Sequence, residues 1–236
     1  MNSSKRLIYS VLTFAVIVLA SCGSKPNYKV SIKNADDSAA YYIGHIYGEQ
    51  MTNSGLTELN IDALARGWQD ANNEVKLEES MDEINAFMMK YFEAARLRLA
   101  DKALKEGQDF LKENEKKQGI VTMPSGLQYR IIREGTGIKP AREDMVDVVY
   151  HGTLIDGTVF DSSKDNNDTV SFSVMRVVPG FSEALTLMNE GSVWEVYIPA
   201  EMGYGENPHP QSGIKPNSVL VFEIDLVKVN KGEEKK

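Results

Sequence analysis

The 236-residue sequence is poor in cysteine and histidine and has no basic cluster. Its single cysteine, Cys22, excludes an internal disulfide. The three histidines, His45, His151 and His209, lie far apart without metal-ligand spacing, so we expect no metal and no other cofactor. The formal net charge is -8, which argues against nucleic acid as a partner.

The sequence also lacks a comfortable membrane span at its N-terminus. The apolar run from Leu7 to Ala20 is shorter than the about 20 residues that a spanning helix needs, and it follows Lys5 and Arg6. This is the pattern of a secretory signal. The letters LASC that end at Cys22 resemble the bacterial lipobox, in which the cysteine is lipidated. We predict a lipoprotein signal peptide with lipidated Cys22 at 1–22; the alternative is a plain signal peptide with an incidental cysteine.

The segment that follows is predicted to be a tether. Residues 23–35 are mostly polar and have little apolar periodicity, whereas multiple acyl chains on Cys22 would give stable membrane anchoring. We therefore predict a lipid-anchored protein of the cell envelope. Gly23 stands where some bacteria use an aspartate to retain lipoproteins in the inner membrane. This favours the outer membrane, on its periplasmic face or at the cell surface.

Residues 36–119 are predicted to form a helical domain. Asp36 or Asp37 can cap a first helix that ends at Gly55, and Asn60 can cap a second helix. Short helices bury little apolar surface alone, so we expect this half to form a homodimer. The alternative is a helical domain that packs on itself or on the C-terminal half.

A third, long helix is predicted from Met81 to about Lys117. Ser80 and Glu83 fit a capping box at its start. Its later part is nearly all polar, which is typical of a helix that bridges solvent between domains or is stabilised by charge pairs. Gly107 is expected to weaken this part locally.

Residues 120–230 are predicted to be rich in strands, with a charged tail at 231–236. Asp156-Gly157 is a tight-turn signal, and 181–189 is a short amphipathic helix with Gly191 as its stop. The predicted fold class is α+β, an antiparallel sheet wrapped on that short helix behind the helical domain. Strands are expected at 127–133, 145–154, 158–161, 170–178, 192–198 and 219–229.

The C-terminal half resembles an FKBP-type peptidyl-prolyl cis/trans isomerase. The resemblance rests on VVYHGTLIDGTVFDSS at 148–163, VVPGFSEALTLMNEGSVWEVYIPAEMGYGE at 177–206 and GIKPNSVLVFEIDLVKV at 213–229. The helical half with its long third helix resembles the bacterial Mip/FkpA-like branch, whose members dimerise through that half.

The resemblance implies a site for the proline of a substrate. Asp161 and Tyr204 would be catalytic, Asp161 by polarising or orienting and Tyr204 by donating its hydroxyl to a substrate carbonyl. The Val178 amide would donate to another carbonyl. Phe181 would form the pocket floor, where many members carry tryptophan. The residues expected to bind the substrate are Tyr150, Phe160, Phe172, Val177, Val178, Phe181, Ile214 and Phe222. Taken singly, the aromatic residues could equally be core, Asp161 could cap a turn, and Tyr204 could anchor a loop.

The implied function is isomerisation of X-Pro bonds in unfolded or partly folded exported proteins, without covalent chemistry. One alternative is an envelope chaperone or holdase in which isomerase activity is secondary. Another is a scaffold lipoprotein that uses an inert fold of this type.

Overall fold

The computed structural model describes residues 30–164, 168–209 and 211–231. The predictions for the signal peptide, Cys22 and most of the tether and tail lie outside these residues. Within the described ranges, no helix combines the length and apolar character needed to cross a bilayer. The chain divides into two compact units between Ile43 and Gly44, inside the first helix.

The first two helices follow from their capping residues. Helix α1 (Ala35–Asn53) is capped by Asn34, whose side chain accepts a hydrogen bond from the Asp37 backbone N–H at 2.8 Å. The prediction of Asp36 or Asp37 as the cap was therefore wrong by two or three positions. Gly55, with a φ of +84°, follows the end of α1 as predicted. Asn60 caps α2 (Ile61–Asn72) and accepts from two backbone N–H groups, as predicted.

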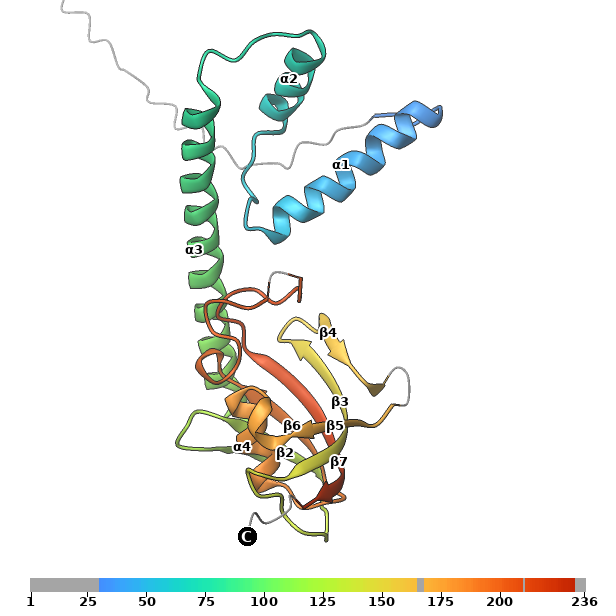
Figure 1. The fold of residues 1–236 in the computed structure, drawn as a ribbon, viewed down its shortest axis with the longest axis vertical. Helices are drawn as coiled ribbons and strands as arrows, with labels where there is room; N and C mark the ends of the chain where they lie inside the picture. Colours follow the sequence, from blue (N-terminus) through green and yellow to red (C-terminus); the bar gives the residue numbers. More distant parts are fainter. Residues whose placement is uncertain (1–29, 165–167, 210, 232–236) are drawn as a thin grey trace, which may run out of the picture. The chain divides into compact units, whose positions relative to one another are not determined.

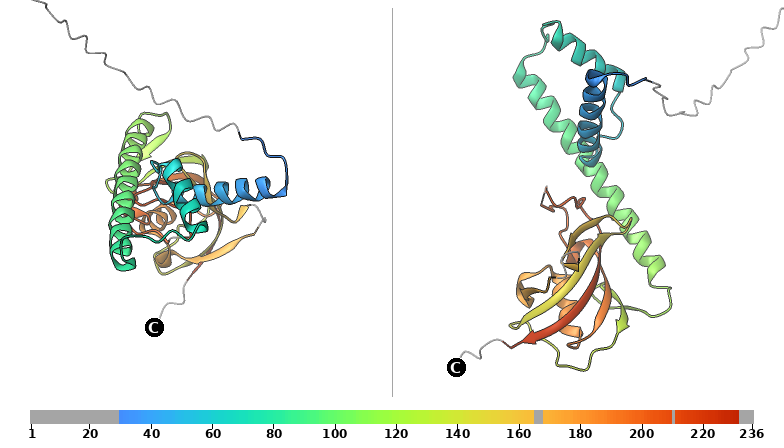
Figure 2. Two further views of the ribbon diagram at one scale, coloured as in Figure 1. Left: turned by 90° about the horizontal axis from the view of Figure 1, so that it is seen from above. Right: turned by 90° about the vertical axis from the view of Figure 1, so that its right-hand side faces the viewer.

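Helix α3 (Met81–Asn114) is 34 residues long and begins with the predicted capping box of Ser80 and Glu83. At about 1.5 Å per residue it extends about 50 Å. The later part of α3 runs beside the sheet domain (Figure 2). Gly107 and Asn114 are buried there, so the prediction that this part bridges solvent is wrong. The alternative, stabilisation by charge pairs, agrees with the ion pairs of Lys102 with Glu106 at 3.8 Å and of Lys116 with Glu113 at 2.7 Å. A Cβ on Gly107 would lie 2.7 Å from Val219 Cγ2. Gly107 therefore permits a close contact between helix and domain.

The C-terminal half is the predicted antiparallel sheet wrapped on a short helix, α4 (Pro179–Leu187) (Figure 1). The sheet order is β1-β2-β6-β7-β3-β4, and β5 also pairs with β3. Every pairing is antiparallel. The strands are β1 (Ile120–Thr122), β2 (Gln128–Arg133), β3 (Met145–Leu154), β4 (Val159–Ser162), β5 (Val170–Ser173), β6 (Val193–Ile198) and β7 (Leu220–Asn230).

Three local predictions need correction. Strand β1 was not predicted, because three residues are too few to show an alternation. The strand predicted at 170–178 ends at Ser173, where a 3-10 turn at Val174–Arg176 begins. Helix α4 starts two residues early because Pro179 fits the first helical turn, and it ends at Leu187. Gly191 (φ +85°) therefore lies in the turn before β6 and does not stop the helix.

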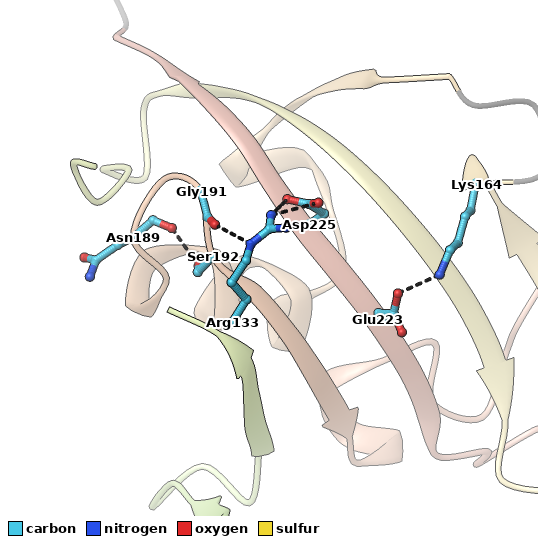
Figure 3. Close-up of polar contacts among 7 residues, drawn as sticks. All are labelled: Arg133, Lys164, Asn189, Gly191, Ser192, Glu223 and Asp225. Carbon is cyan, nitrogen blue, oxygen red and sulfur yellow. Dashed lines mark hydrogen bonds and ion pairs between the residues drawn. The ribbon is translucent and has the colours of Figure 1, made fainter. Parts of the chain in front are cut away.

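The two faces of the sheet differ in chemistry. Along β7, the buried Leu220, Phe222, Ile224 and Leu226 alternate with Val221, Glu223 and Asp225. The buried set packs with α4 in one core. The outer set forms ion pairs: Arg133 with Asp225 at 3.0 Å and Lys164 with Glu223 at 2.7 Å (Figure 3). The inner face is therefore the one that can build an apolar site.

Candidate active site

Five aromatic rings from five different elements meet at one end of the core. Six pairs of these rings are in contact, with centroids 5.0–6.4 Å apart, and every one of these pairs is tilted or edge-to-face. Tyr150, Phe181 and Phe222 each contact three other rings of the group. All five were predicted to bind substrate, and we call them the aromatic cluster: Tyr150 (β3), Phe160 (β4), Phe172 (β5), Phe181 (α4) and Phe222 (β7).

A glycine that the sequence analysis missed allows two of these rings, Phe160 and Phe222, to pack closely against the backbone of β3. Gly152 is buried in β3, opposite Phe222 on β7. A Cβ at Gly152 would lie 2.8 Å from Phe160 Cζ and 2.8 Å from Phe222 Cε1. The sequence could have indicated this role, because a glycine inside a predicted strand often marks a position where another group approaches the backbone closely.

Asp161 is held at the edge of the aromatic cluster by Tyr150. The Tyr150 hydroxyl donates a 2.7 Å hydrogen bond to Asp161 Oδ2. Burial raises the pKa of Tyr150 well above its usual value, and the hydrogen bond to Asp161 and its negative charge raise it further. Tyr150 therefore remains a protonated donor to the exposed Asp161 carboxylate.

Tyr204 lies in the loop between β6 and β7, flanked by Gly203 and Gly205, and is 44% exposed. Burial raises the pKa of its phenol, and the negative charge of Asp161 raises it further. The phenol is therefore a neutral donor near physiological pH that lies within the electric field of Asp161.

Three aliphatic residues complete the predicted set. Val177 and Val178 are half-buried against the core, and Ile214 is buried in it. The Val178 carbonyl accepts from the Ser182 N–H at 3.0 Å as α4 begins. Within the part of the chain that the structure describes, nothing accepts a hydrogen bond from the Val178 N–H.

A hollow of about 380 Å³ adjoins this site and was not predicted. It shares Val177 with the predicted set. Met175 and Met202 give it apolar walls, and the exposed Arg142 lines it as well. The hollow therefore adjoins the predicted set at Val177 and has a mixed lining, with Arg142, Ser182, Glu183 and Thr186 beside the apolar residues.

Comparison with known proteins found family models that match both halves of the chain. Residues 136–227 match the model of the FKBP-type peptidyl-prolyl cis-trans isomerase, and residues 36–131 match that of the domain amino terminal to FKBP-type peptidyl-prolyl isomerase. The chain is 41% identical over 230 residues to the outer membrane protein MIP of Legionella longbeachae, covering 94% of this chain and 97% of that protein.

Two relatives from Escherichia coli extend the comparison. The FKBP-type 22 kDa peptidyl-prolyl cis-trans isomerase of strain K12 is 43% identical over 194 residues, covering 81% of this chain and 94% of that protein. The crystal structure of FkpA superposes with a TM-score of 0.61 at 32% identity, covering 85% of this chain and 99% of that one. The predicted enzyme class and the predicted Mip/FkpA-like branch are confirmed: the chain belongs to the FKBP-type peptidyl-prolyl cis-trans isomerase family.

Proposed function

We propose that the aromatic cluster binds the proline ring of an unfolded or partly folded exported protein and accelerates rotation of the X-Pro bond. The observation that carries this proposal is the convergence of five rings with one carboxylate at their edge. Proline is apolar, and rings from separate strands and a helix can surround it without a charged group at the centre.

The chemistry needs neither a nucleophile nor a proton relay. Rotation of a peptide bond has a barrier of about 18–20 kcal/mol, because the amide loses its conjugation when it twists. Tighter binding of the twisted form than of the planar form lowers this barrier. Each tenfold acceleration requires about 1.4 kcal/mol of such preference.

Polar groups at the edge would fix the carbonyls as the bond twists. Tyr204 is proposed to donate its hydroxyl to one substrate carbonyl, and the Val178 N–H to another. Support comes from the raised pKa of Tyr204 and from the position of Val178 at the start of α4. Asp161 is proposed to orient the substrate by its charge, because Tyr150 already satisfies one of its oxygens.

The direct test is isomerisation of a short X-Pro peptide, followed by NMR exchange, with the full chain in detergent. We expect activity in the wild type and at least a tenfold loss in the Tyr204→Phe/Asp161→Ala variant. The matched control is Tyr47→Phe/Asp109→Ala, because both residues are exposed and lie in helices outside the site. A folded but inactive wild type would refute the proposal.

We also propose that the helical half forms a homodimer. Along α2, Ile61, Leu64 and Trp68 recur on one face and are 50–61% exposed, and on α3 Phe87 is 64% exposed. Large apolar side chains gathered in this way are typical of an interface that a second copy covers. Sedimentation of the full chain should give a dimer mass. Trp68→Glu should shift it toward monomer, whereas Glu58→Lys, an exposed charge change beside α2, should not. A monomeric wild type would contradict the interface.

The same exposed residues favour a second candidate function, that of a chaperone or holdase. Apolar surface on α2 and α3 could hold unfolded chains while isomerisation stays secondary. Suppression of aggregation should then depend on Trp68 and Phe87 and survive the loss of Tyr204. The opposite dependence would leave isomerisation as the primary role.

We propose that lipidated Cys22 anchors the protein in the cell envelope. A relative at 41% identity is named an outer membrane protein, which supports this location. Cys22→Ser should move the protein from the membrane pellet to the soluble fraction. Retention in the pellet would exclude the anchor.

A further inference from the structure

Helix α3 contacts the loop that carries Tyr204 at two points. Near the middle of the helix, Arg96 Nη1 donates to the Glu206 backbone carbonyl at 3.3 Å. About three turns later, Gly107 lies so close to Val219 that a Cβ would approach its Cγ2 to 2.7 Å. The same face of α3 makes both contacts, so the helix touches the loop at Glu206 and at Val219.

One contact is at Glu206, near the start of the loop, and the other is at Val219, just before β7. The Gly205 carbonyl, next to Glu206, accepts from the Asn217 N–H at 2.8 Å, and this bond closes the loop at its base. Tyr204 lies just before that bond, and Ile214 lies inside the loop that it closes. Both residues belong to the proposed site, so the position of the base affects each of them.

The guanidinium of Arg96 is itself held in place. Its Nε and Nη2 donate to the two carboxylate oxygens of Glu93 at 3.1 and 3.0 Å. This two-point ion pair leaves Nη1 for the Glu206 carbonyl. The charged groups that act on Arg96 are thus Glu93 on its own helix and the Glu206 side chain on the loop.

The C-terminal end of α3 is fixed to the sheet. Asn114 is fully buried and donates to Gln128 Oε1 at 3.0 Å, and Gln128 donates to the Leu111 carbonyl at 2.9 Å. Phe110 packs against Tyr197 with ring centroids 5.9 Å apart. These contacts fix the C-terminal end of α3 relative to the sheet, so the helix can restrain the loop.

We propose that α3 is a structural support of the active site, and that Arg96 is a positioning residue for the Tyr204 loop. This inference rests on the proposed isomerase function of the aromatic cluster. The helical half then contributes to catalysis in each single chain, independently of its role in dimer formation. Loosening the α3 contacts lets Tyr204 and Ile214 move away from the bound proline.

The first test is Arg96→Met in the full chain, in detergent. Methionine keeps much of the apolar stem and removes the donors. We expect kcat/KM on an X-Pro peptide to fall threefold or more, chiefly through KM, and Arg96→Lys to recover part of it. Arg98→Met is the matched control, because Arg98 is exposed on the same helix and makes no hydrogen bond or ion pair within the described part of the chain.

A readout independent of activity is the titration of the Tyr204 phenol, followed by NMR of ¹³Cζ-labelled tyrosine and assigned with Tyr204→Phe. Arg96→Met should lower its pKa toward the ordinary tyrosine value, because the loosened loop exposes the phenol to water. Wild-type kcat/KM together with a wild-type Tyr204 titration would overturn the inference.

A second variant tests the other contact. Gly107→Ala should push Val219 and lower kcat/KM, and Gly107→Ala/Val219→Ala should restore it by removing the clashing methyl group. Gly67→Ala is the control, because no atom lies within 4 Å of a Cβ at that helical position. Equal activity of Gly107→Ala and Gly67→Ala would count against the support role. An inactive wild type would refute the proposed function, whereas the Tyr204 titration would still decide this inference.

Discussion

Replacing Gly152 by alanine puts a methyl group between two rings of the aromatic cluster. The added Cβ would stand 2.8 Å from Phe160 Cζ and 2.8 Å from Phe222 Cε1. Carbon atoms pack best at about 3.5–4.0 Å, so the two rings together must yield by roughly 1 Å or more. Gly152 lies near the C-terminal end of β3 and pairs with Asp161 on β4 and Phe222 on β7, so partner strands on both sides restrict its backbone.

The expected loss of stability in Gly152→Ala comes from overpacking of the core. Extra atoms in a filled core cost about 1–3 kcal/mol in the free energy of unfolding. The effect on activity should be larger than the effect on folding, because a misplacement of about 1 Å in a binding site can cost up to about a hundredfold in rate. We therefore expect Gly152→Ala to lower kcat/KM about tenfold or more while the protein stays folded at 25 °C.

The assay pairs urea unfolding with NMR-detected isomerisation. Thr153→Ala is the control, because it changes the next residue of the same strand, which is not part of the aromatic cluster. Adding Phe160→Leu to Gly152→Ala should recover stability by removing one of the crowded ring atoms. Wild-type stability and wild-type kcat/KM in Gly152→Ala would refute the reasoning, because the rings would then be free to move without consequence.

Three further predictions concern groups around the site. Tyr150→Phe removes the donor to Asp161 and should lower kcat/KM several-fold with a stability loss of about 1–3 kcal/mol, measured by isomerisation and urea unfolding; no change in either would contradict the role of this bond. Arg133→Met breaks the exposed pair with Asp225 and should cost less than about 1 kcal/mol and leave activity unchanged, so a large loss of activity would show coupling across the sheet. Burial, with the hydrogen bond to and the charge of Glu195, raises the pKa of Tyr197 to about 12, whereas unfolded tyrosine titrates near about 10. The unfolded state therefore loses this proton first, and stability should fall as pH rises between these values; Tyr197→Phe should flatten that fall in urea unfolding at pH 9 and 11.

Local chemistry determined much of the fold. Asn60 and the pair of Ser80 and Glu83 marked helix starts correctly, because capping depends on neighbours within three residues. The β3 range was predicted to the residue, since its Val- and Tyr-rich sequence is bounded by clear turn signals. The Asn34 cap was missed because several polar residues near the start of α1 offer similar side chains, and only the backbone decides among them.

Only the tertiary structure decided what packs against what. The polar end of α3 was expected to bridge solvent or to be stabilised by charge pairs, yet Gly107 and Asn114 are buried. A glycine permits a close approach to Val219, and the Asn114 amide donates to Gln128 Oε1 across the contact. The five rings of the aromatic cluster were named from a family resemblance, but their contacts come from five elements spread over about seventy residues. Short-range pattern fixes where helices and strands begin. Long-range packing alone determines which atoms meet, because contacts such as Gly152 with Phe222 depend on strand pairing that no local stretch of sequence contains.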